Sequence, residues 1–447
     1  MALQNTDFSS KEINEMLKKS QQIFFIGIGG ISMSSLATYM HFKGYKIHGY
    51  DKERTKECQK LESIAKIQYY STPDRVRGMD LVVYSLAIVE NNFEYKMAKK
   101  LKIPTLSRAN LLGYIISSYK NSIGIAGTHG KSTTTSILGK IFDYAGRSPT
   151  VFCGAYMKDF GGSLHLGQDE HCVFEACEYM NSFHYMIPNE LAILNIEYDH
   201  PDFFKSSLEL ENSFKTLSYA PKRLYVNADD KVAKRIIERE AITYGILCDA
   251  DYRAIIENDG FSVLYRGKKI AKCKTKFTGD HFVYDFLCAF SVAHENNIAP
   301  SVICGAISEF QGVKRRLEYV GNLDTSLPVF EDYGHHPTEI KATISSLLKM
   351  GYQKILCAFQ PHTYSRSYYL YNEFITSFKG VHELYFLPTF KAREENTFGL
   401  NEEQFAHDSG GRLLSSFDEL FCVARKTDSD VLLLLGAGDI TNFKKYL

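Results

Sequence analysis

The segment Gly127-Thr128-His129-Gly130-Lys131-Ser132 carries the residue types that a phosphate-binding loop needs. It follows a short apolar run over residues 121–126, and a helical pattern begins at Ser132. Glycines allow the backbone N–H groups to wrap around a phosphate chain, and a helix N-terminus attracts the same anion. Lys131 would neutralise the β- and γ-phosphates of a nucleotide, and Ser132 would bind Mg²⁺. The segment therefore predicts an enzyme that uses ATP.

One position of this loop departs from the general phosphate-loop pattern. That pattern has a glycine five residues before Gly130, where this chain has Ile125. The loop is therefore a shorter variant, G-T-x-G-K-[ST]. A glycine-rich turn that binds no ligand is the alternative interpretation, and the strand–loop–helix context favours the phosphate site.

Acidic and histidine side chains follow two later apolar runs. Glu175 ends the first of these runs and Glu178 follows it. Asp199 and His200 follow the second run. The carboxyl ends of parallel strands meet at one edge of a sheet, so we expect Glu175 and His200 to reach one metal ion beside the phosphate loop. Mg²⁺ prefers oxygen ligands, and a histidine among them indicates a specific site. Any one of these acids alone is better explained as a solvated surface residue.

A second glycine-rich turn lies near the N-terminus. The pattern Gly27-x-Gly29-Gly30-x-Ser32 resembles the dinucleotide fingerprint, with Ser32 at the third glycine, and Asp51 stands where a ribose-binding acid is found. The turn predicts a nucleotide diphosphate at a helix N-terminus, without specifying NAD. An NAD-linked oxidoreductase would leave the loop at Lys131 unexplained, and a tight turn without a ligand remains an alternative.

The C-terminal third of the chain contributes basic and histidine side chains. Paired arginines such as Arg315 and Arg316 hold carboxylate or phosphate oxygens in a bidentate manner. His335 and His336 lie in a loop and are equally explained as ordinary loop histidines. The remaining motifs are Gln360-Pro-His-Thr-Tyr-Ser-Arg366 and Gly436-Ala-Gly-Asp439, and the second of these is also explained as a turn.

Alternating strand and helix patterns must position these residues. Apolar runs of strand length recur over 22–26, 46–51, 121–126, 191–194, 354–359 and 431–435, with helical patterns between them. This alternation predicts parallel sheets, and 447 residues exceed one ordinary domain. We predict three α/β domains over residues 1–118, 119–312 and 313–447.

The composition excludes several classes of protein. Lysine plus arginine and aspartate plus glutamate both number 52, which gives no support for nucleic-acid binding. The polar N-terminus does not resemble a signal peptide, and no apolar run is long enough to span a membrane. The ten cysteines contain no C-x-x-C pair, so their spacing does not indicate a zinc or thioredoxin site. We expect no disulfide scaffold and a reducing cytoplasm.

Taken in order, these motifs resemble those of the Mur ligases of peptidoglycan synthesis, from Gly27 to Asp439. The segments Gly-Ile-Gly-Gly, Asp-Tyr-Gly-His-His-Pro-Thr-Glu and Phe-Gln-Pro-His-Thr-Tyr-Ser-Arg favour the alanine-adding branch of the family. A murein-recycling branch that attaches a preformed peptide, and a catalytically silent nucleotide-binding paralogue, remain open alternatives.

The resemblance implies a fold and a reaction. The fold would comprise a Rossmann-like N-terminal domain, a central P-loop ATPase-type domain and a C-terminal Rossmann-like domain. With ATP and Mg²⁺, the carboxylate of UDP-N-acetylmuramate would attack the γ-phosphate to give an acyl phosphate and ADP. L-alanine would then displace phosphate. The enzyme would be a cytoplasmic monomer or dimer.

The resemblance also assigns roles to individual residues. Those expected to act in catalysis are Lys131, His200, His129, Arg316, His335 and Arg366, and the magnesium ligands are Ser132, Glu175 and His200. ATP would contact Gly127, Thr128, His129, Gly130, Lys131, Ser132, Thr133, His281, Asp285 and Arg316. The substrate would contact Gly29, Gly30, Ser32, Asp51, Ser85, Glu178, Asn195 and His336.

Two departures from the family pattern affect binding. The family has a motif G-x-H-N-x-x-N on the adenine side of its ATP site. In this chain Phe282 and Asp285 replace the two asparagines of that motif. Asp285 would accept a hydrogen bond from the adenine amino group but would not donate one to the ring, so we expect an altered adenine contact. Pro388 stands where relatives often have an aspartate, which alters the expected amino-acid pocket.

Overall fold

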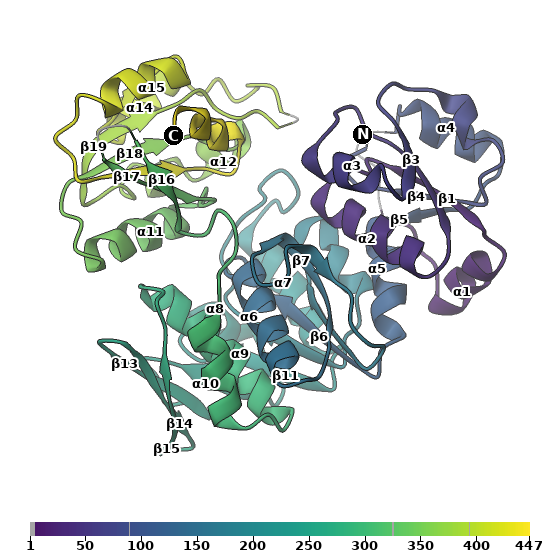
Figure 1. Ribbon diagram of the computed structural model, residues 1–447, viewed down its shortest axis with the longest axis horizontal. Coiled ribbons are helices and arrows are strands. Elements are labelled where there is room, and N and C mark those ends of the chain that lie inside the picture. Colours follow the sequence, from purple (N-terminus) through teal and green to yellow (C-terminus); the bar gives the residue numbers. More distant parts are fainter. Residues whose placement is uncertain (1–4, 89, 324–325, 393) are drawn as a thin grey trace.

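The computed structural model describes residues 5–88, 90–323, 326–392 and 394–447. It contains three α/β units, each built on its own sheet. In Figure 1 the N-terminal unit lies at the upper right, the C-terminal unit at the upper left, and the central unit below them. The predicted three-domain α/β fold class is confirmed by these sheets.

The N-terminal sheet has five strands in the order β3-β2-β1-β4-β5, and every neighbouring pair is parallel. The glycine-rich turn lies between β1 and α2, so it sits at the carboxyl end of the central strand. The elements are α1 Ser10–Lys18, β1 Gln22–Ile26, α2 Ile31–Phe42, β2 Lys46–Tyr50, α3 Lys56–Leu61, β3 Ala65–Gln68, η1 Pro73–Val76, β4 Leu81–Tyr84, α4 Phe93–Lys100, β5 Thr105–Ser107 and α5 Arg108–Ser117.

The central sheet has ten strands in the order β15-β14-β13-β12-β11-β10-β6-β9-β7-β8. Strand β6 lies between β9 and β10 and is parallel to both, so the loop after it meets the ends of both neighbours. The elements are β6 Asn121–Ala126, α6 Lys131–Tyr144, β7 Thr150–Met157, β8 Gly162–His165, β9 His171–Glu175, η2 Tyr179–Tyr185, β10 Glu190–Ile193, α7 Ser207–Ser218, β11 Arg223–Asn227, α8 Lys231–Ile236, β12 Ile242–Gly245, β13 Tyr252–Glu257, β14 Gly260–Tyr265, β15 Lys268–Lys274, α9 Asp280–Glu295 and α10 Pro300–Glu309.

The C-terminal sheet has six strands in the order β16-β17-β21-β18-β19-β20, and only its edge strand β16 is antiparallel to its neighbour. Strand β21 is buried along its whole length, as expected for a parallel sheet that is covered on both faces. The elements are β16 Glu318–Asn322, β17 Pro328–Asp332, α11 Pro337–Lys349, β18 Ile355–Phe359, α12 Tyr364–Tyr369, α13 Tyr371–Phe374, β19 Val381–Phe386, α14 Glu402–Asp408, β20 Arg412–Leu413, α15 Phe417–Ala424, β21 Val431–Leu435 and η3 Asp439–Tyr446.

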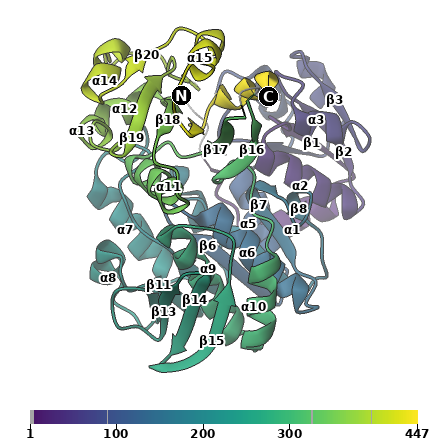
Figure 2. The ribbon, with the colours of Figure 1, turned by 60° about the vertical axis from the view of Figure 1, so that its left-hand side comes forward.

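The C-terminal unit packs against the central unit through α11. Figure 2 shows this helix between the C-terminal sheet and the central elements. A capping box fixes its start: the side chain of His336 accepts the N–H of Thr338, and the carboxylate of Glu339 accepts the N–H of His336. The N-terminus of α11 is therefore held in a defined position beside the phosphate loop.

A disulfide links Cys273 of β15 to Cys304 of α10. The cysteine spacing did not predict this pairing. The two residues are 31 positions apart, and neither lies in a recognisable motif, so only the fold brings them together. Within the described part of the chain, no helix is both long and apolar enough to cross a membrane.

Candidate active site around the phosphate loop

The loop between β6 and α6 adopts a conformation that requires glycine at two positions. Gly127 has φ +141° and Gly130 has φ +84°, both in the left-handed region that other residues rarely adopt. A Cβ atom at Gly130 would lie 2.4 Å from Asp285 Oδ1, and one at Gly127 would lie 2.9 Å from Leu194 Cβ. Because Gly130 is the N-cap of α6, the loop directs the positive end of that helix at any bound anion.

Lys131 is the first residue of α6, and its ammonium group folds over the loop. Its Nζ donates to the carbonyl oxygens of Gly127 and Thr128, at 2.6 and 3.0 Å, and to Glu178 Oε1 at 3.0 Å. Burial opposes the charge of Lys131, but the negative groups around it, Glu178 foremost, together raise the pKa of the ammonium group. Glu178, which we expected to contact the substrate, therefore serves here as the counter-ion of the loop lysine.

The three predicted magnesium ligands line one cavity of about 760 Å³, together with Lys131. Ser132 comes from α6, Glu175 from the end of β9, and His200 from the segment after β10. A Cβ at residue 154 would lie 2.3 Å from Glu175 Oε2, so Gly154 leaves the space that this carboxylate occupies. A hydroxyl, a carboxylate and an imidazole around one cavity fit a bound divalent cation.

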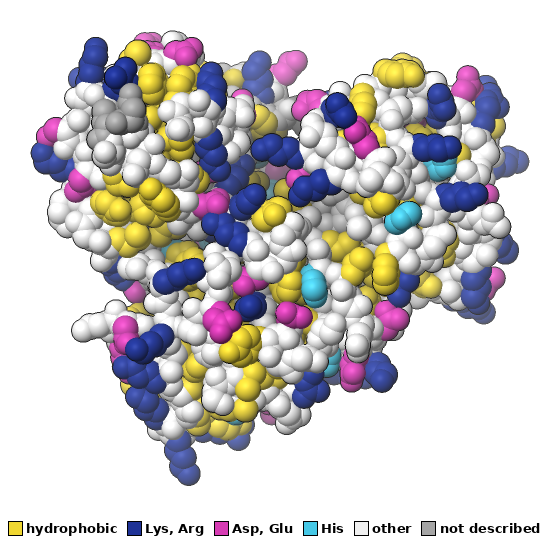
Figure 3. All heavy atoms as spheres, viewed as in Figure 1, with side chains coloured by type: hydrophobic (Ala, Val, Ile, Leu, Met, Phe, Trp, Pro, Cys, Tyr) yellow, Lys and Arg dark blue, Asp and Glu magenta, His cyan; other side chains and the backbone are white. Residues whose placement is uncertain are grey.

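Basic side chains from the three units surround this cavity. Figure 3 shows lysine and arginine side chains gathered in the hollow between the two upper units. Such a concentration of positive charge suits a ligand with several phosphates or carboxylates. The basic residues that line the cavity are Lys56, Lys60, Lys131, Lys314, Arg315, Arg316 and Lys444.

A second cavity, of about 410 Å³, lies on the other side of the loop. Of the predicted residues, it is lined by His129, Gly130, Thr133, Asn195, His281, Asp285 and Arg316. Burial lowers the pKa of His281 to about 4 and raises that of Asp285 to about 8. The Asp285 carboxyl, which accepts the Thr134 hydroxyl at 3.0 Å, is therefore largely neutral at pH 7. A neutral carboxyl carries a proton that it can donate, which the sequence pattern alone did not indicate.

Several predicted residues support the loop directly. Asn195 Oδ1 accepts the N–H of His129 at 2.8 Å, and its amide group donates to the His129 carbonyl at 3.0 Å. The Thr128 hydroxyl donates to the Glu197 carbonyl at 2.9 Å and accepts the Glu197 N–H at the same distance. The side chains of Asn195 and Thr128 thus hold the segment after β10 against the loop.

The predicted residues of the N-terminal unit make hydrogen bonds within that unit. Asp51 Oδ2 accepts the N–H of Gly29 at 2.8 Å, so this carboxylate stabilises the turn. The Ser32 hydroxyl accepts a hydrogen bond from Arg108 at 3.1 Å, and the Ser85 hydroxyl accepts the N–H of Ala87 at 3.2 Å. Arg108, which the sequence motifs did not reveal, begins α5 and brings a cation to the turn.

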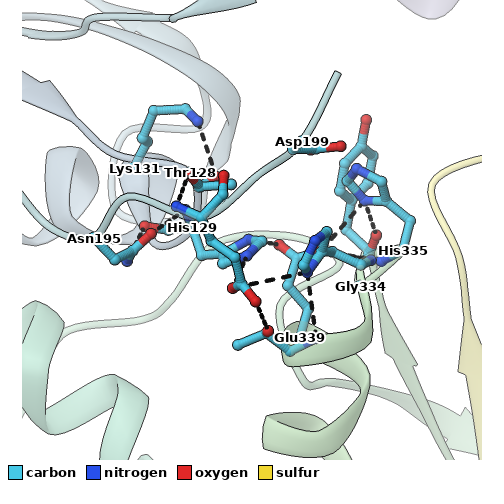
Figure 4. A network of polar contacts seen from close by, with 12 residues as sticks. Thr128, His129, Lys131, Asn195, Asp199, Gly334, His335 and Glu339 are labelled. Carbon is cyan, nitrogen blue, oxygen red and sulfur yellow. Dashed lines mark hydrogen bonds and ion pairs between the residues drawn. The ribbon is translucent and has the colours of Figure 1, made fainter. Parts of the chain in front are cut away.

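Glu339 of the C-terminal unit reaches the loop, and Arg316 and His335 lie beside it. Figure 4 shows His129, Glu339 and His335 around a shared network that links the central and C-terminal units. His129 Nδ1 lies 3.3 Å from Glu339 Oε1, and Arg316 Nη1 lies 3.5 Å from the same oxygen. Burial lowers the pKa of His335 well below its ordinary value, so its imidazole is neutral. Glu339 was not among the predicted site residues, although it lies in the motif after His336.

Arg366 forms a buried ion pair across the boundary between the two units. Its Nε donates to Asp199 Oδ1 at 2.8 Å and its Nη2 to Asp199 Oδ2 at 3.3 Å. Both side chains are at most 7% exposed. The fold thus places Arg366 next to the segment of His200, where it fixes the C-terminal unit against the central one.

Comparisons with known proteins identify the family. The family models described as "Mur ligase family, catalytic domain", "Mur ligase middle domain" and "Mur ligase, glutamate ligase domain" match residues 22–120, 125–293 and 315–438. UDP-N-acetylmuramate–L-alanine ligase of Caldicellulosiruptor bescii is 37% identical over 93% of this chain and 96% of its own. The same enzyme of Aquifex aeolicus is 36% identical over 96% and 97%.

Solved structures show the same fold. UDP-N-acetylmuramate-alanine ligase of Thermotoga maritima superposes with a TM-score of 0.81 and 23% identity, covering 95% of this chain and 97% of its own. A murein peptide ligase of Psychrobacter arcticus superposes with a TM-score of 0.72 and 21% identity over 95% and 97%. The phosphate loop, the cavities beside it and these similarities together show that the chain belongs to the Mur ligase family.

Proposed function

We propose that this chain is an ATP-dependent ligase that joins L-alanine to the carboxylate of UDP-N-acetylmuramate. One observation carries the proposal: a single cavity brings the loop lysine, three ligands suited to Mg²⁺ and basic side chains from the three units to one place. Relatives at 36–37% identity are UDP-N-acetylmuramate–L-alanine ligases, which supports the choice of substrates.

The three units would divide the binding of the substrates. Residues 1–118 would hold the UDP group at the turn that contains Gly29, Gly30 and Ser32, with Arg108 as an additional cation. Residues 119–312 would bind ATP at the phosphate loop, and residues 313–447 would bring the amino acid. We further propose a cytoplasmic enzyme, where ATP and UDP-linked sugars are available, acting as a monomer or a dimer.

The first step would transfer the γ-phosphoryl group to the muramyl carboxylate and form an acyl phosphate. Two anions must approach each other, so positive charge at the transferring group lowers the barrier. Lys131, Arg316 and the N-terminus of α6 would supply that charge from opposite sides of the loop. Mg²⁺ held by Ser132, Glu175 and His200 would add a Lewis acid at the phosphate oxygens.

The second step would use His335. Its Nδ1 lies 3.1 Å from the Tyr333 carbonyl oxygen, an acceptor that favours a proton on Nδ1 and leaves Nε2 as a base. His335 lines the larger cavity, where the Nε2 of its neutral imidazole would accept a hydrogen bond from the attacking amine and orient it. The nitrogen would then attack the acyl carbon, and phosphate would leave.

The amino acid that reacts is a direct test of this proposal. With UDP-N-acetylmuramate and ATP–Mg²⁺ present, alanine should release phosphate fastest. Glycine should be slower by roughly 10- to 200-fold, since one methyl group is worth about 1–3 kcal/mol, and serine should be slower because the pocket must accommodate its hydroxyl. If a preformed tripeptide releases phosphate faster than alanine does, the chain is instead a murein-recycling ligase. Phosphate release that does not depend on any amine would contradict the proposal.

Asp285 should make nucleotide binding depend on pH. Its pKa of about 8 lies above the ordinary value of 3.8, so the neutral form predominates below pH 8 and is lost as the pH rises through 8. A neutral carboxyl donates one hydrogen bond and accepts another, as asparagine does. We expect ADP affinity, measured by calorimetry, to fall at least threefold between pH 7.2 and 9.2. Asp285→Asn should remove this dependence, and an equal fall in that variant would contradict the assignment.

A further inference from the structure

A cluster of possible metal ligands lies outside the proposed magnesium set. Ligand atoms of His129, Glu197 and His336 all lie within 4.8 Å of one another. His129 Nε2 is 3.1 Å from Glu197 Oε2, and His336 Nδ1 is 3.9 Å from the same oxygen. The three side chains therefore converge on one point, with Glu197 Oε2 between the two rings.

Both imidazoles are oriented by a contact at their other nitrogen. His129 Nδ1 lies 3.3 Å from Glu339 Oε1, and His336 Nε2 lies 3.3 Å from the carbonyl oxygen of Tyr198. Carboxylate and carbonyl acceptors at these positions favour protons on His129 Nδ1 and His336 Nε2. The remaining nitrogens, His129 Nε2 and His336 Nδ1, face the cluster, as in metal-binding histidines. Without a cation, His129 Nε2 donates to Glu197 and His336 Nδ1 accepts the Thr338 N–H at 3.3 Å, and a bound cation would replace both contacts.

The carboxylate of the cluster is also oriented. Glu197 Oε1 accepts the hydroxyl of Thr338 at 2.6 Å, which leaves Glu197 Oε2 directed at the two rings. Three ligand atoms placed about 2.1 Å from a tetrahedral ion are about 3.4 Å apart. The observed separations of 3.1 and 3.9 Å from Glu197 Oε2 are close to this value, so small side-chain rotations would complete the site.

We propose that His129, Glu197 and His336 bind a divalent transition-metal cation of the Zn²⁺ class. Two imidazoles and one carboxylate suit such a cation, whereas Mg²⁺ prefers oxygen ligands. His129 belongs to the phosphate loop and His336 is the N-cap of α11, so the cation joins the central unit to the C-terminal unit. His129 and Glu197 line the smaller cavity, which leaves a fourth coordination position for water or a ligand oxygen.

Cobalt titration of the metal-stripped, nucleotide-free full chain tests this site. Co²⁺ gives visible absorption bands when bound in tetrahedral geometry, and we expect one equivalent to bind, to be displaced by Zn²⁺, and to raise the melting temperature. Glu197→Gln should abolish the bands while keeping an acceptor for Thr338. His336→Asn should abolish them as well, and asparagine preserves the helix cap.

Two control variants distinguish this site from other metal-binding positions. His382→Ala removes a ligand from the exposed cluster His382, Glu383 and Asp428, and Glu175→Gln removes one from the proposed magnesium set. Both should leave the bands unchanged. The proposal is overturned if the wild-type chain shows no bands, if the bands persist in Glu197→Gln or His336→Asn, or if either control removes them. Since no nucleotide is present, these outcomes are independent of ligase activity.

Discussion

Replacing Lys131 by methionine is expected to lower the rate of amino-acid-dependent phosphate release by ~10³-fold or more, the upper part of the range for one charge-stabilising donor. Lys131 holds the carbonyl groups of the loop and would meet the transferring phosphoryl group. Single-turnover measurements with saturating ATP would separate this loss from weaker nucleotide binding.

A matched variant separates catalysis from stability. Removal of Lys131 leaves Glu178, which is 2% exposed, with the more distant His200 at 3.6 Å as its partner, so part of any loss would reflect a destabilised site. The double variant Lys131→Met with Glu178→Gln removes both charges and should recover thermal stability without recovering turnover. A Lys131→Met enzyme that retains more than a tenth of wild-type turnover would show that the loop lysine does not carry the chemistry.

Replacing Arg366 by methionine should lower the free energy of unfolding by about 3–5 kcal/mol, the usual cost of leaving one charge of a buried pair alone. Asp199 would keep a buried negative charge at the boundary between the central and C-terminal units. Urea unfolding would measure the loss. The double variant with Asp199→Asn should recover much of it, because the uncompensated charge is then absent.

The exposed pair of Arg54 and Glu62 provides a control for this measurement. Arg54 Nη2 lies 2.7 Å from Glu62 Oε2, but the arginine side chain is 61% exposed. Water screens such a pair, so Arg54→Met should change stability little. Equal losses in Arg54→Met and Arg366→Met would contradict the role assigned to the buried pair.

Local patterns in the sequence were sufficient to predict the phosphate loop and its neighbours. The run of residues into Gly127 and the helix after Gly130 define a strand–loop–helix unit without reference to the rest of the chain. Strand order then brings Glu175 and His200 to the same cavity as Ser132, because β9 and β10 flank β6. The topology of a parallel sheet therefore makes this part of the site predictable.

Contacts between distant segments were not predictable from motifs. Glu178 pairs with Lys131, Asp51 binds the N–H of Gly29, and Asn195 binds the backbone of His129, so these predicted binding residues also have structural partners. The neutral state of the Asp285 carboxyl likewise depends on how deeply the fold buries it. Such pairings and burial depend on the docking of whole units, which spacing along the chain does not specify.

The transfer of oxygen from the carboxylate to phosphate tests the central claim most directly. UDP-N-acetylmuramate labelled with ¹⁸O in its carboxylate would be incubated with the enzyme, ATP–Mg²⁺ and L-alanine, and the released phosphate analysed by mass spectrometry. An acyl-phosphate route predicts one ¹⁸O atom in each phosphate and one in the new amide. Unlabelled phosphate, or label in released AMP, would contradict the account.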